Sequence, residues 1–120
     1  MKKQLLFLVL MMLPMVASAD DSGTCGENLT WTYVENTGTL TISGNGDMYN
    51  YSSTHSSPWY SYVMNINNLI ISDGVTSIGE FAFEYCRVSY VDIPNSIVSI
   101  GEYNQEIMGK TNVEIIPVIA

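Results

Sequence analysis

The sequence predicts a mainly β fold with short helices, in which an N-terminal β-hairpin cap is followed by a short α/β solenoid. Two observations lead to this prediction. Apolar and polar residues alternate along residues 28–34 and again along residues 39–43, which is typical of half-buried strands. Residues 69–80 then recur in modified form as residues 91–102, which is typical of supersecondary units that stack on one another.

The first nineteen residues show the three parts of a secretory signal peptide. Lys2 and Lys3 precede an apolar run that ends at Pro14, and small residues at positions 17 and 19 form a cleavage site. The apolar run is too short to span a bilayer comfortably. We therefore expect residues 1–19 to be removed before Asp20. This expectation predicts a secreted or cell-surface protein that is not inserted in a membrane after cleavage.

The chain is strongly acidic. It contains 4 Lys and Arg residues against 12 Asp and Glu residues, for a net charge of −8. Loss of Lys2 and Lys3 with the signal peptide would leave Arg87 and Lys110, so that the net charge falls to 2 − 12 = −10. Nucleic-acid affinity comes largely from basic side chains on phosphates. We therefore expect no nucleic-acid partner.

Residues 20–67 are expected to form the β-rich cap. The two alternating segments predict two strands, and Gly38 between them suits a hairpin loop because glycine accepts a positive φ. Pro58 favours the start of a short helical segment. Trp59 is expected to hold this otherwise loose loop against the sheet.

The two copies of the repeat are related by a constant offset in residue number. "LIISDGVTSIGE" begins at Leu69 and "VDIPNSIVSIGE" begins at Val91, so the offset is 91 − 69 = 22. This offset predicts parallel pairing of the two strands, with Val75 and Ile78 filling the interior below them. Gly79 is expected to let the backbone bend into the compact segment "EFAFEYC".

These segments resemble a known family. "GVTSIGEFAFEYC" and "VDIPNSIVSIGE" resemble the BspA-type leucine-rich repeat of bacterial surface proteins, and "CGENLTWTYVENTGTLTISGNGDMYNY" with "SPWY" resembles the β-rich cap that precedes such repeats. The resemblance implies that residues 68–120 hold two to three leucine-rich repeats, the last incomplete. It also implies a non-enzymatic protein-binding or adhesion module at the bacterial cell surface, with a host or cell-surface protein as partner.

The second copy departs from the family pattern. Asn104 and Gln105 stand where alanine and phenylalanine usually occur, and Met108 replaces cysteine. Amide side chains cost free energy when they are buried without partners. We therefore expect the second repeat to be less well ordered than the first, whose anchors would be Phe81, Ala82, Phe83 and Cys86.

Few residues suggest chemistry. The polar loop around His55 favours a solvated histidine, and no catalytic, cofactor-binding or metal-binding pattern is recognised. Cys25 and Cys86 are compatible with a disulfide after export or with free buried thiols. The candidate ligand contacts are four aromatic residues, which could instead cover the end of the solenoid: Tyr49, Tyr51, Tyr60 and Tyr62.

Two alternatives to a binding module stay open at this point. The chain is also compatible with a truncated or decayed fragment that has no independent function, since its second repeat is irregular. A small hydrolase that uses Cys86 or His55 is a weaker alternative, because the sequence offers no clear pairing of a base with a nucleophile.

The C-terminal segment generates a prediction of self-association. Val113 and Ile115 continue the offset of the repeat, and with Ile116 they form an apolar strand that no later strand follows in this sequence. An exposed apolar edge pairs readily with a second chain. We expect concentration-dependent association, measured by sedimentation, and weaker association for Ile115→Lys. A protein that stays monomeric at high concentration would contradict the open-edge prediction.

Overall fold

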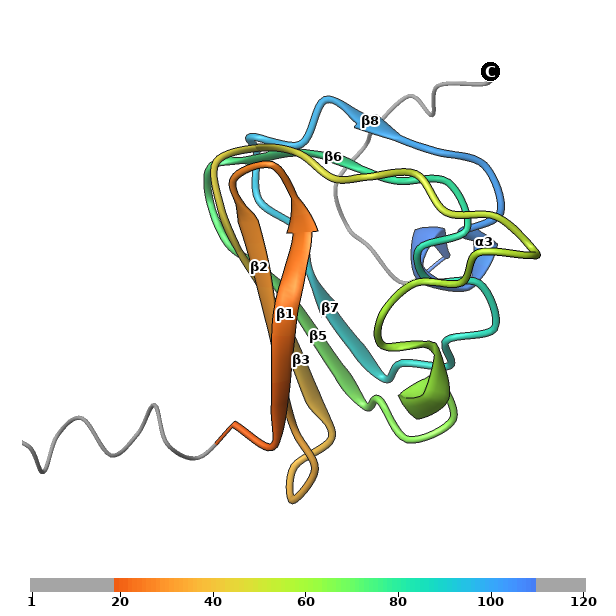
Figure 1. Cartoon of the computed structure of the whole chain (residues 1–120). Helices are drawn as coiled ribbons and strands as arrows, with labels where there is room; N and C mark the ends of the chain where they lie inside the picture. Colours follow the sequence, from red (N-terminus) through yellow and green to blue (C-terminus); the bar gives the residue numbers. More distant parts are fainter. Residues whose placement is uncertain (1–18, 110–120) are drawn as a thin grey trace, which may run out of the picture.

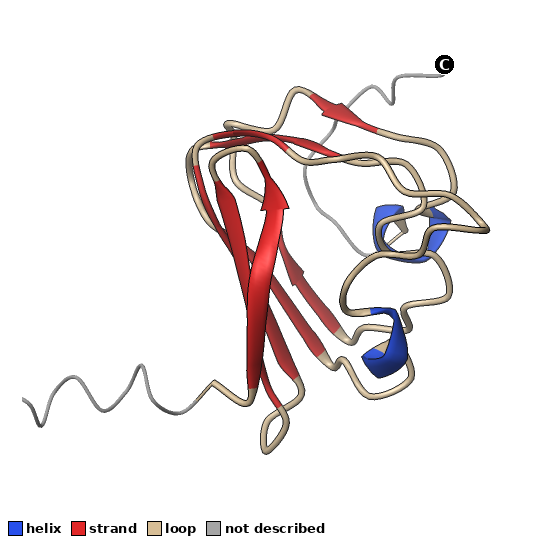
Figure 2. Ribbon diagram, viewed as in Figure 1, coloured by secondary structure: helices blue, strands red, loops and turns tan. Residues whose placement is uncertain are grey.

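The computed structural model describes residues 19–109, which form a mainly β fold with few helices, as the sequence predicts (Figures 1 and 2). The signal peptide and the segment proposed for self-association lie outside these residues, apart from Ala19. Along the chain, the elements are β1 (Asp21–Gly26), β2 (Leu29–Val34), β3 (Thr39–Gly44), β4 (Gly46–Asp47), the 3-10 helix η1 (Tyr60–Tyr62), β5 (Asn68–Ile71), β6 (Val75–Ile78), β7 (Tyr90–Asp92), β8 (Ser99–Ile100) and α3 (Gln105–Met108).

The strands form two sheets around one apolar core. The larger sheet has five strands in the order β1-β2-β3-β5-β7, and the smaller has three in the order β4-β6-β8. Figure 1 shows the larger sheet on one side of the core and the loops that carry η1 and α3 on the other. The smaller sheet connects these two sides. The core therefore receives side chains from both sheets and from the loops.

The predicted hairpin is confirmed. β2 pairs antiparallel with β3, and Trp31 lies opposite Ile42. Along β2 the buried residues alternate with more exposed threonines, as the period of two requires. Gly38 has a φ of 67° in the connecting turn. The sequence did not indicate β1, which pairs antiparallel with the other side of β2.

The offset between the two copies is confirmed by the strand register. β5 pairs parallel with β7, with Leu69 opposite Val91. β6 pairs parallel with β8, with Ile78 opposite Ile100. Equivalent residues of the two copies therefore lie side by side in both sheets, which explains why their apolar pattern is shared.

The parallel ladder begins earlier than the sequence suggested. β3 pairs parallel with β5, so that Leu40 lies opposite Leu69 and Ile42 opposite Ile71. The offset in residue number is larger here, at 69 − 40 = 29, because the loop that follows β4 is longer than the corresponding segment of the next copy. The large sheet thus continues without a break across residue 67, and β3 belongs both to the hairpin and to the ladder.

Gly79 has a different role from the one expected. It does not adopt a left-handed conformation, whereas Phe81 has a φ of 59°. A Cβ atom at Gly79 would lie 1.8 Å from the backbone oxygen of Tyr49. Glycine is therefore required because successive turns of the chain approach backbone to backbone, and the bend itself falls two residues later.

The first repeat places most of its predicted anchors in the core. Ala82, Phe83 and Cys86 are buried, while Phe81 is only half-buried. The segment forms successive hydrogen-bonded turns rather than a helix: the Ala82 amide donates to Gly79 O, and the Cys86 amide donates to Phe83 O. These turns direct Phe83 inward while leaving residues 84 and 85 at the surface.

The second repeat is anchored by different residues. Gln105 is exposed, but Asn104 is completely buried and fully hydrogen-bonded. Its Nδ2 donates to Gly79 O at 3.0 Å and to Gly101 O at 2.8 Å, and its Oδ1 accepts from the Phe83 amide at 2.8 Å. The expected cost of a buried amide is thus offset by partners in both repeats. Ile107, in α3, provides the apolar anchor.

The two adjacent amides of this repeat generate a prediction. In Asn104→Ala, the Phe83 amide and two carbonyls lose their buried partner, so unfolding by urea should require about 2–3 kcal/mol less free energy. Gln105→Ala is the matched control and should change stability by less than about 0.5 kcal/mol because the side chain is exposed. Equal losses for the two variants would contradict the proposed role of Asn104.

Candidate functional site

Trp59 fixes the long loop between β4 and β5 against the core, as the sequence predicts. Its side chain is fully buried, and its Nε1 donates to Ala82 O at 2.8 Å. Its ring stacks on Phe83 with the centroids 5.2 Å apart, and it meets Trp31 edge-on at 5.8 Å. The loop is therefore held by the first repeat, which brings polar loop residues next to residues 81–85.

Two of the four candidate tyrosines serve largely in packing. Tyr62 stacks on Tyr33 at a centroid distance of 4.3 Å and donates a hydrogen bond to Asp21 Oδ2 at 2.5 Å. That hydrogen bond raises the pKa of Tyr62. Tyr51 meets the edge of Trp59 and is half-buried, and desolvation raises its pKa. Their rings leave little surface for a ligand.

The other two candidate tyrosines are exposed. Tyr49 has 47% of its surface accessible and Tyr60 has 41%. The backbone of Tyr49 lies between two other segments. Its amide donates to Cys25 O, and its carbonyl oxygen faces Gly79. Tyr60 starts η1 and lines a pocket. Packing therefore occupies Tyr51 and Tyr62, whereas Tyr49 and Tyr60 are exposed.

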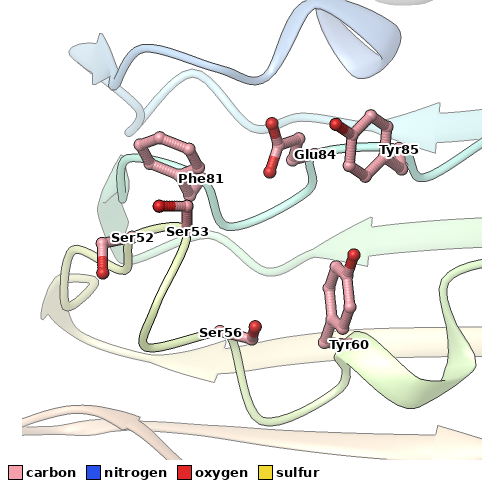
Figure 3. Close-up of a pocket in the computed structure, with 7 residues that line it drawn as sticks. All are labelled: Ser52, Ser53, Ser56, Tyr60, Phe81, Glu84 and Tyr85. Carbon is pink, nitrogen blue, oxygen red and sulfur yellow. The ribbon is translucent and has the colours of Figure 1, made fainter.

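The pocket that contains Tyr60 lies between the long loop and the first repeat, and it has a volume of about 240 Å³. Figure 3 shows Glu84 between Phe81 and Tyr85, with Tyr60 on the facing loop. We call this pocket the tyrosine groove. It is lined by three serines, three aromatic residues and one acid: Ser52, Ser53, Ser56, Tyr60, Phe81, Tyr85 and Glu84.

Sequence reasoning missed the contribution of the first repeat to this groove. Phe81 was expected to be a core anchor, but its ring stacks on Tyr103 outside the core at a centroid distance of 4.1 Å. Tyr85 is 55% exposed. The available signal was that residues 84 and 85 lie between the inward positions 83 and 86, which leaves them free to face outward.

The two cysteines are free, buried thiols and form no disulfide. Desolvation raises the pKa of both Cys25 and Cys86 to about 12. A thiol with such a pKa is almost entirely protonated near neutral pH and is a poor nucleophile. His55 lies in an exposed loop, where its amide donates to Ser52 O.

The described part of the chain lacks two further features. Between residues 19 and 109, no three His, Cys, Asp or Glu side chains are grouped so that they could hold a metal ion. Over the same residues, no helix has the length and apolar character needed to cross a membrane.

A known protein family matches more than half of the chain. The family model described as "BspA type Leucine rich repeat region (6 copies)" matches residues 53–116. The chain belongs to the BspA-type leucine-rich repeat family. The predicted resemblance is therefore confirmed, and the protein is a repeat module of this family. The match begins within the long loop that Trp59 fixes, upstream of β5.

A solved structure is similar to this BspA-type chain. It is a leucine-rich repeat protein from Eubacterium ventriosum, with 32% sequence identity and a TM-score of 0.59. The similarity covers 68% of this chain and 22% of that protein, so this chain spans less than a quarter of its length. No curated protein matches the chain.

The buried thiols generate a prediction about reactivity and pH. Iodoacetamide at pH 8 should modify neither cysteine in the folded protein and both in denaturant, as measured by mass spectrometry. Because folding raises both pKa values from 9.0 to about 12, the neutral thiols stabilise the fold fully below pH 9, and this contribution is lost as the pH rises toward 12. Rapid modification of folded Cys86 would contradict the burial.

Proposed function

We propose that this BspA-type chain is an exported, non-enzymatic protein-binding module that acts in adhesion at the bacterial cell surface. Membership of the leucine-rich repeat family supports protein binding. The signal-peptide pattern of residues 1–19 supports export, and it predicts a mature N-terminus at or near Asp20. The partner is a protein of a host or of another cell surface.

The observation that carries this proposal is the exposure of aromatic side chains on the loop side of the repeats. Tyr60, Tyr85 and Tyr103 all come from this side and have 41%, 55% and 46% of their surface accessible. Exposed tyrosines are enriched in protein interfaces because they combine a large apolar body with a polar tip. The ring of Tyr103 is held on this side by stacking on Phe81.

A binding role is favoured over the hydrolase alternative by the state of the nucleophile. Cys86 is completely buried, and its thiol pKa is raised to about 12. His55 makes hydrogen bonds within its own loop, with Nδ1 3.4 Å from the Thr54 hydroxyl. These features supply no activated thiol near a base, which nucleophilic catalysis requires.

The finer architecture is also a proposal. We infer that the repeats stack as a short solenoid, in which residues 20–67 form the cap and residues 68–120 the repeats. The parallel registers of β3, β5 and β7 support stacking in one direction. The continuation of the ladder into β3 means that cap and repeats share one sheet, so we expect them to unfold together.

Export is tested first and adhesion second. The gene is expressed in a secreting bacterial host, and mass spectrometry of the exported protein should find Asp20 at the N-terminus. The exported protein is then titrated onto immobilised extracellular proteins, and we expect saturable binding to at least one of them that free protein competes away. Recovery of intact Met1 in the membrane fraction would overturn export. Cooperative unfolding together with no saturable binding would overturn adhesion, and non-cooperative unfolding would favour the fragment alternative.

A further inference from the structure

The tyrosine groove combines one negative charge with aromatic surfaces. Among residues 19–109, Glu84 is the only charged residue that lines it, and it lies between Phe81 and Tyr85 in Figure 3. Tyr60 faces this group from the other side of the groove. Aromatic faces are electron-rich, and a cation within about 6 Å of a ring centroid is attracted to them. A carboxylate with aromatic neighbours is thus suited to a positively charged group.

The backbone of the groove adds one observation, at Tyr85. Its φ of 67° lies in the left-handed region that glycine adopts most readily. Phe81 is also left-handed, but it shares this conformation with Tyr103, the equivalent residue of the second copy, so there it belongs to the turn of the repeat. A large side chain in this conformation costs free energy, and such residues cluster at functional sites. Tyr85 is 55% exposed, so burial of its ring offsets little of the free energy that the left-handed backbone costs. A ligand that contacts the ring would account for its presence.

The surrounding charge favours a cation over a neutral ligand. Glu106 Oε1 lies 3.4 Å from the Tyr85 amide nitrogen, which brings a second carboxylate close to the groove. Of the 12 acidic residues, all except Glu114 fall within residues 19–109, whereas Arg87 is the only Lys or Arg in that range. The potential over this part of the chain is therefore negative and attracts basic partners.

The size of the groove suits about one side chain. Its volume is about 240 Å³. Pockets for whole small molecules commonly enclose about 300–1,000 Å³. We propose that the tyrosine groove binds a single lysine or arginine side chain of a protein partner, with the cation between the rings of Tyr60 and Tyr85 and paired with Glu84. This inference rests on the proposed protein-binding function and specifies the chemistry of the contact.

The test uses two peptide probes and the full chain labelled with ¹⁵N. The probes are acetyl-Gly-Arg-Gly-amide and its uncharged counterpart acetyl-Gly-Gln-Gly-amide, titrated at pH 8 and low ionic strength. We expect saturable shifts of the backbone resonances of residues 81–85 with the arginine peptide and none with the glutamine peptide. Equal shifts with both, or larger shifts with a neutral disaccharide, would overturn the proposal.

Two variants locate the interaction, and a third is their control. Glu84→Gln should weaken binding of the arginine peptide about threefold or more, since it removes the charge pair. Tyr85→Gly should weaken it similarly without destabilising the protein, because glycine accepts the left-handed backbone. Glu27→Gln makes the same change of charge at the exposed turn between β1 and β2, and it should leave binding unchanged. Equal affinities for Glu84→Gln and the unmodified protein would overturn the proposal.

The same variants separate this inference from the proposed function. If the exported protein binds a protein partner and Glu84→Gln binds it equally well, adhesion stands and the cation site is wrong. If the arginine peptide binds as described but no protein partner is bound, the cation site stands and the adhesion proposal fails.

Discussion

The close approach of successive turns at two glycines is the constraint on which the structure depends. At Gly79 a Cβ atom would lie 1.8 Å from Tyr49 O, and at Gly101 it would lie 2.7 Å from the Glu80 amide nitrogen. The two glycines occupy the same place in consecutive copies. Because backbone meets backbone there, Asn104 reaches both copies of the repeat, at Gly79 and at Gly101, and the strands on either side are held in register.

The fold could be predicted from the sequence where the sequence repeats itself. Strands β5 and β7 could be paired from the sequence because equivalent apolar residues recur at one constant offset in both copies. The pairing of β3 with β5 could not be recognised in this way. Its offset is larger, and the loop after β4 contains none of the Gly-x-x-Ala-Phe pattern that marks the next turn.

The candidate site was predictable only in part, because a tyrosine can pack and bind with the same side chain. The sequence does not distinguish Tyr62 from Tyr60. The Tyr62 hydroxyl donates to Asp21, which is far away in the sequence, whereas the Tyr60 ring remains exposed. Asn104 was recognised as unusual, but its partners come from the preceding turn, and only the folded chain brings them together. The left-handed backbone of Tyr85 has no counterpart in the sequence pattern, whereas that of Phe81 recurs at Tyr103, the equivalent residue of the second copy.

The unequal lengths of the first turn, from β3 to β5, and the second, from β5 to β7, show where this fold tolerates a change of length. The extra residues of the first turn fall between β4 and β5, while Leu40 still meets Leu69 in register. Surface loops accept insertions at small entropic cost, and contact residues are commonly found on them. The loop side can therefore be remodelled by insertion or exchange of segments without altering the sheets. Chains with this backbone could diverge in what they recognise while they remain alike in how they fold.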